Sequence, residues 1–148
     1  VDYIARLMEW CGLQDRWAYR AASLDGLCFG LSEFQILRLF EKADAIVNLT
    51  ASTLLREEHL QVPARIYLET DPGLPQILVA KGNYQIIDFL NAHTHHFTFG
   101  ENFGEPDCGL PVGPFDYCPT RQPIIIDWWS LSSDRDTDRN QWSNGVRC

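Results

Sequence analysis

Short apolar runs alternate along this chain with segments of helical periodicity. The apolar runs have the length of strands, and they lie at residues 17–21, 44–49, 64–69, 95–99 and 123–129. The helical segments repeat apolar residues every three or four positions, and they lie at residues 4–11, 31–40 and 75–91. The pattern therefore predicts a domain in which helices and strands alternate.

Turn and capping residues mark several ends of these segments. Gly12 follows the first helical segment at the position where a glycine commonly ends a helix. Ser32 and Gln35 have the spacing of a capping box at the start of the second. The Lys-Gly-Asn sequence at residues 81–83 interrupts the third, so we expect a break there.

The predicted strands are nearly all apolar, which is typical of a parallel sheet covered by helices on both faces. We therefore expect an α/β fold, a Rossmann-like doubly wound and mainly parallel sheet, over residues 1–130. Residues 131–148 lose all periodicity and are predicted to form a polar, disordered tail. Residues 99–123 are rich in Gly, Pro and Asp and predict a long ordered loop, which suggests a functional role.

Three small or polar loops follow predicted strands, and in open α/β sheets ligands bind beyond the carboxyl ends of strands. The loops are residues 50–52, 70–73 and 100–104. We expect them to face one cleft and to present hydroxyls, a carboxylate and free amides to a sugar or phosphate. The candidate binding residues are Thr50, Ser52, Thr70, Gly100, Asn102, Gly104 and Arg121, and the candidate catalytic carboxylates are Asp71 and Glu101.

Several of these residues also have a structural interpretation. Ser52 has the character of a cap for a helix starting near Leu54, and Asp71 precedes Pro72 as an N-cap precedes a proline at the first helical position. The two glycines suit tight turns. Arg121 is suited to clamp loop carbonyls or carboxylates.

Histidines cluster before the third loop, at His93, His95 and His96. On a strand, His93 and His95 would share one face, and His96 would point to the other. At about 3.3 Å per residue, His95 and Glu101 would be roughly 20 Å apart, too far to bind one metal ion. We therefore expect packed or surface histidines bonded to nearby backbone and no metal site. A metal-dependent hydrolase built on His93 and His95 is an alternative.

The amino-acid composition disfavours nucleic acid as a partner and a membrane span. The net charge of −8 disfavours binding to nucleic acid, and no apolar run is long enough to predict a membrane span. The five cysteines show no C-x-x-C spacing, so we expect free thiols and a cytoplasmic location. Because the chain begins at Val1 within a helical pattern, we also expect it to be a piece of a longer protein.

Several segments together resemble an uncharacterised bacterial group of glycosyltransferase-like proteins with the GT-B architecture. They are QDRWAYR, ADAIVNLTAS, RIYLETDPGLPQI, HTHHFTFGENFGEPDCGLP and PTRQPIIIDWW. The resemblance covers residues 1 to about 130. It implies that the chain is the later part of the N-terminal, acceptor-binding domain, with the C-terminal domain for the nucleotide-sugar donor missing.

The resemblance also implies roles for the candidate residues. In an inverting transferase of this architecture, a side chain of the N-terminal domain deprotonates the acceptor hydroxyl. Asp71 is the first candidate for this base and Glu101 the second, while Ser52 and Asn102 would orient sugar hydroxyls. The expected partner is a small-molecule or glycan acceptor, no cofactor is expected in this chain, and the isolated chain is expected to be inactive. The alternative is a ligand- or partner-binding module without chemistry.

Overall fold

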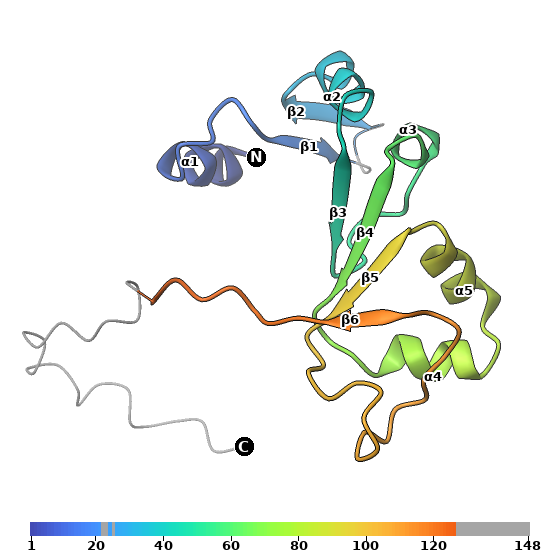
Figure 1. The fold of residues 1–148 in the computed structure, drawn as a ribbon. Helices are drawn as coiled ribbons and strands as arrows, with labels where there is room; N and C mark the ends of the chain where they lie inside the picture. The colour runs from blue at the N-terminus through green and yellow to red at the C-terminus, as the bar shows by residue number, and fades with distance from the viewer. Residues whose placement is uncertain (22–23, 25, 127–148) are drawn as a thin grey trace, which may run out of the picture.

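The structure is a computed structural model, and it describes residues 1–21, 24 and 26–126. These residues form a mixed α/β fold (Figure 1). In chain order its elements are α1 (Asp2–Trp10), β1 (Ala18–Ala21), β2 (Leu27–Gly30), α2 (Glu33–Phe40), β3 (Ala45–Leu49), α3 (Glu57–Leu60), β4 (Ala64–Glu69), α4 (Leu74–Ala80), α5 (Tyr84–Asn91), β5 (His95–Thr98) and β6 (Tyr117–Pro119).

Four strands form a parallel sheet in the order β3-β4-β5-β6. Each strand is added on the same side of the one before it, as in one half of a doubly wound sheet. The prediction of an α/β fold with a parallel sheet is thus confirmed, and the arrangement is compatible with a Rossmann-like fold. β1 and β2 instead form a separate antiparallel hairpin, and β2 was not predicted.

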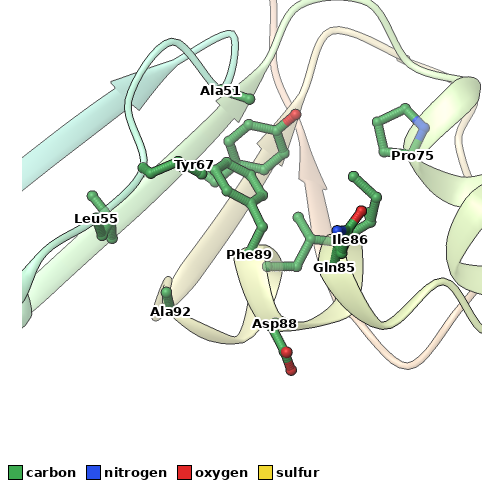
Figure 2. A pocket seen from close by; sticks show the side chains of 11 residues that line it. Ala51, Leu55, Tyr67, Pro75, Gln85, Ile86, Asp88, Phe89 and Ala92 are labelled. Atoms are coloured by element: carbon green, nitrogen blue, oxygen red, sulfur yellow. The ribbon is translucent and has the colours of Figure 1, made fainter. Parts of the chain in front are cut away.

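The hydrophobic core lies between one face of this sheet and helices α4 and α5. Tyr67 of β4 packs with Val79 and Leu90, and Phe89 meets the Tyr67 ring edge-on at a centroid distance of 5.4 Å (Figure 2). On the opposite face, Val47 and Leu49 of β3 are 56% and 49% exposed. The sequence predicts that helices cover both faces of the sheet. Within the described part of the chain, helices α4 and α5 cover one face.

Three predicted helix boundaries are confirmed. α1 ends before Gly12, which has a φ of 69° that favours glycine. Ser32 and Gln35 form the expected capping box at the start of α2. The third helical segment is divided into α4 and α5 at residues 81–83, and the Asn83 side chain caps α5 by accepting from the Ile86 amide.

The prediction of a strand at residues 123–129 is wrong for residues 123–126, the part that the structure describes. Residues 123–126 do not join the sheet, and its fourth strand is β6, within the expected loop. Pro123 has no amide hydrogen to donate to a ladder, and Ile124 and Ile126 are exposed. Residues 127–129 and the predicted tail at 131–148 lie outside the described residues. Within the described ranges, no helix is long and apolar enough to cross a membrane.

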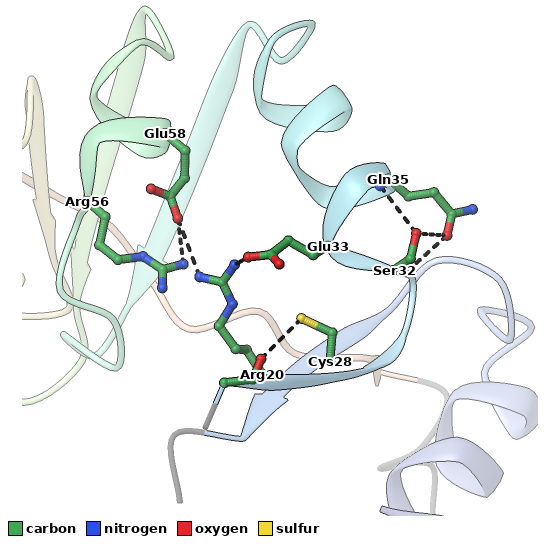
Figure 3. A network of polar contacts seen from close by, with 8 residues as sticks. Arg20, Cys28, Ser32, Glu33, Gln35, Arg56 and Glu58 are labelled. Atoms are coloured by element: carbon green, nitrogen blue, oxygen red, sulfur yellow. Dashed lines mark hydrogen bonds and ion pairs between the residues drawn. The ribbon is translucent and has the colours of Figure 1, made fainter. Parts of the chain in front are cut away.

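An arginine joins the hairpin to the rest of the domain. The Arg20 guanidinium of β1 pairs with Glu33 of α2 and, at 3.5 Å, with Glu58 of α3 (Figure 3). Arg56 pairs with the same Glu58 carboxylate at 2.7 Å. One half-buried guanidinium thus bridges two helices. We expect it to contribute more to the stability of the fold than an isolated surface ion pair does.

We expect Arg20→Gln to lower the free energy of unfolding by about 1 kcal/mol, because both carboxylates lose a charged donor. Urea unfolding measures this loss. The matched control is Arg38→Gln, which removes an exposed pair with Glu41 within α2 and should cost less than about 0.5 kcal/mol. Equal losses in the two variants would contradict the bridging role of Arg20.

Candidate functional site

The parallel register brings the predicted loops to one edge of the sheet. Leu49, Leu68, Phe97 and Cys118 are aligned across the four strands, so the strands end together. The loops that follow therefore begin at the same edge, which we call the carboxyl edge. Thr50 begins the first of these loops, and its amide still bonds Leu68 at 3.0 Å. The carboxyl edge is the candidate functional site.

The second and third loops are in contact at a glycine. A Cβ on Gly100 would lie 3.2 Å from the Pro72 side chain and 3.4 Å from Thr98 Oγ1. The Gly100 amide donates to this Thr98 hydroxyl at 3.1 Å. Gly104 has a φ of 88°, so it serves a turn that favours glycine. The two glycines therefore have the structural role of packing and turning the loop.

Arg121 reaches back from the end of β6 to the third loop. Its guanidinium donates to the Glu101 carboxylate at 2.9 Å, and both side chains are largely exposed. The predicted clamp between Arg121 and a carboxylate is present. Asn102 lies exposed beside Glu101, and Thr70 lies half-buried at the end of β4.

Two predicted helix caps are wrong. No helix starts near Leu54, because α3 begins at Glu57, so the exposed Ser52 caps nothing. The N-cap of α4 is Gly73 and not Asp71, since the helix starts two residues later than expected. The Gly73 amide is satisfied by the Gln76 side chain at 2.7 Å. Asp71 is exposed, and no hydrogen bond engages its carboxylate in the described part of the chain.

This edge also holds a buried carboxyl group that the sequence patterns did not predict. Glu69 ends β4 and is 1% exposed, and its Oε2 accepts a hydrogen bond from Gln76 at 2.7 Å. Its Oε1 is buried without a partner among the described residues, as is the Tyr117 hydroxyl. Burial raises the pKa of Glu69, and the charge of Asp71 acts in the same direction. The sequence feature that could have indicated this buried carboxyl group is the glutamate at the end of an otherwise apolar run.

His93 and His96 are packed and bonded to backbone, as predicted, but the predicted pairing of His93 with His95 on one strand face is wrong. β5 begins only at His95, so His93 lies before the strand, buried at 5% exposure. The rings of His93 and His96 are 6.4 Å apart, whereas His95 is exposed. His93 Nδ1 lies 2.9 Å from the Phe89 carbonyl, and His96 Nε2 lies 3.0 Å from the Leu90 carbonyl.

A buried asparagine holds the first loop. Asn48 of β3 donates to the Thr53 carbonyl at 2.7 Å and lies 3.1 Å from His93 Nε2. His93 therefore accepts at Nε2 and donates from Nδ1, which requires a neutral ring. Burial lowers the pKa of His93 and favours that neutral form. Thr50 and Ala51 both adopt left-handed backbone, with φ of 59° and 57°, so the asparagine holds a strained turn.

A cluster suited to a metal ion is not found in the described part of the chain, where no three His, Cys, Asp or Glu side chains converge. Both ring nitrogens of His93 are already engaged, so a metal ion bound to either nitrogen would displace a hydrogen bond. No protein-family model, curated protein or solved structure matches this chain.

The neutral ring of His93 predicts a dependence of stability on pH. We expect the free energy of unfolding to fall as the pH drops below 6.5, the ordinary histidine pKa, because the unfolded chain then binds a proton that folded His93 does not. Urea unfolding at several pH values measures this. His93→Gln should reduce the dependence, and the exposed control His95→Gln should leave it unchanged. The opposite ranking would contradict the assignment.

The buried carboxyl of Glu69 predicts the reverse trend. Because its pKa is raised in the folded state, Glu69 should stabilise the fold below pH 4.5, its ordinary pKa, and lose that contribution as the pH rises. Glu69→Gln should therefore increase the free energy of unfolding at neutral pH and change it little in acid. Thermal unfolding of this variant beside the exposed Glu57→Gln checks the difference, and a loss of stability at neutral pH would refute it.

Proposed function

We propose that the carboxyl edge binds a neutral, hydroxyl-bearing small molecule, and that the chain is the acceptor-binding part of a glycosyltransferase-like protein. The observation that carries the proposal is the exposed Asp71 carboxylate, free of hydrogen bonds to the described residues, at the edge where parallel strands end. Carboxylates accept hydrogen bonds from sugar hydroxyls, so this edge suits a carbohydrate acceptor. The resemblance to GT-B proteins supports the same proposal.

The charges at the edge disfavour an anionic ligand. Glu69, Asp71 and Glu101 are carboxyl groups, and Arg121 is already paired with Glu101. A phosphate brought here would meet negative charge and would compete for an occupied guanidinium. This charge distribution supports an acceptor site on this chain, and the proposal gives the nucleotide-sugar donor to a second domain.

Asp71 is the better candidate for a general base. Glu101 already accepts a hydrogen bond from Arg121, whereas the Asp71 carboxylate is available to an acceptor hydroxyl. Asp71 is also anchored to the core, since it follows buried Glu69 by two residues and precedes the Pro72 that packs on Gly100. A base must sit on a positioned loop to abstract a proton efficiently.

Binding is tested with simple sugars as probes. Glucose, galactose, mannose and N-acetylglucosamine are titrated separately into the ¹⁵N-labelled chain at millimolar concentration. The proposal predicts saturable amide shifts at Thr50, Thr70, Asp71, Gly100 and Asn102 with at least one sugar. Shifts confined to other segments, or no saturable shift with any of the four sugars, would reject a carbohydrate site at this edge.

Catalysis is tested by Asp71→Asn in a protein that joins this chain to its proposed donor domain. We expect kcat for sugar transfer to fall about 10²- to 10⁴-fold, because general-base catalysis is lost. The matched control is Asp44→Asn, an exposed aspartate at the amino end of β3, which should leave kcat unchanged. Sugar binding without any effect of Asp71→Asn on turnover would instead favour a binding module without chemistry.

A further inference from the structure

A separate pocket lies on the helix-covered face of the sheet. Its volume is about 690 Å³, within the range of pockets that bind small molecules. One wall is the loop after β3, the other is α5, and the Tyr67 ring lies between them (Figure 2). Most of its lining is apolar, and the residues that line it include Ala51, Leu55, Tyr67, Pro75, Asp88 and Phe89.

The pocket follows from the shape of the connection between β3 and β4. That connection contains a single short helix, α3, of four residues, and its other residues form an extended loop. Such a connection covers less of the sheet than the long helix that usually joins parallel strands. Part of the face of β4, where Tyr67 lies, is therefore left as the floor of a hollow.

The hydroxyl of Tyr67 is the polar group that gives this pocket a specificity. Tyr67 is 4% exposed, yet its hydroxyl has no hydrogen bond to the residues that the structure describes. In Figure 2 it is directed toward the end of the pocket where Ala51 and Pro75 lie. The buried polar atoms without a partner in the described residues are Glu69 Oε1 and the Tyr117 hydroxyl, so the Tyr67 hydroxyl opens on the pocket. A bound acceptor atom would gain from it a hydrogen bond worth about 0.5–1.5 kcal/mol.

Burial raises the pKa of Tyr67 to about 12. The phenol therefore keeps its proton at neutral pH and is available as a donor. It needs an acceptor, such as a carbonyl or ether oxygen. The walls of Leu55, Phe89 and Pro75 suit a planar apolar body around that oxygen.

We propose that this pocket binds a neutral aromatic or similarly compact apolar molecule whose carbonyl or ether oxygen accepts a hydrogen bond from Tyr67. An anion is disfavoured because Asp88 lies at the rim, in a chain whose net charge is −8. The pocket is distinct from the sugar site proposed above, and its occupancy does not depend on sugar transfer. Ala51 belongs to the loop that also carries Thr50, so the two sites share one loop.

Coumarin and naphthalene are a matched pair of probes for this pocket. Both are flat, fused two-ring molecules, but only coumarin carries a carbonyl. Their dissociation constants are measured by protein-observed NMR on the chain and on Tyr67→Phe, which keeps the ring that packs against Phe89. We expect Tyr67→Phe to weaken coumarin roughly three- to tenfold, the worth of one hydrogen bond, and to change naphthalene less than about twofold.

Blocking the pocket gives a second, independent test. Leu55→Trp places a larger side chain in the wall and should abolish binding of both probes. Val112→Trp introduces the same residue at an exposed position outside the pocket lining and should leave both dissociation constants unchanged. The absence of saturable coumarin binding to the original chain would overturn the proposal. Equal weakening of both probes by Tyr67→Phe, or full binding to Leu55→Trp, would overturn it as well.

Discussion

The side chain of Asn48 is the link between the two proposed sites. It is 4% exposed, and it bonds the Thr53 carbonyl on one side and His93 on the other. His93 in turn bonds the Phe89 carbonyl of α5. A continuous chain of hydrogen bonds thus joins the first loop of the carboxyl edge, the central sheet and the helix that walls the pocket. Because Asn48 and His93 are both buried, the loss of either leaves a polar atom of the other unsatisfied.

This chain of bonds explains why a strained loop keeps its shape. Two successive left-handed residues, Thr50 and Ala51, cost roughly 1–2 kcal/mol each relative to ordinary backbone. The bonds from Asn48 to both the amide and the carbonyl of Thr53 hold the turn closed. The strained residues therefore keep their positions, with Thr50 at the carboxyl edge and Ala51 in the lining of the pocket. Strain held in this way is common at binding sites.

The strands that contain long apolar runs could be predicted from the sequence. The short edge strand and the partners of buried polar side chains could not. Residues 44–49, 64–69 and 95–99 became parallel strands, because apolar runs of that length are buried most readily in a covered sheet. Short β6 was missed because its edge position needs little apolar sequence, and the exposed run at residues 123–126 was mistaken for it. The partners of Glu69 and His93 depend on tertiary contacts, which no local pattern encodes.

The buried titratable groups act on stability in opposite directions. His93 favours folding at higher pH, since its neutral ring is required, whereas Glu69 favours folding at lower pH, since its charged form is penalised. The His93 contribution is lost as the pH falls below 6.5, and the Glu69 contribution is lost as the pH rises above 4.5. At neutral pH the neutral His93 supports the loop, while the Glu69 carboxyl destabilises the fold at the carboxyl edge. A polar group that lowers stability at the end of a central strand is more readily explained by function than by folding.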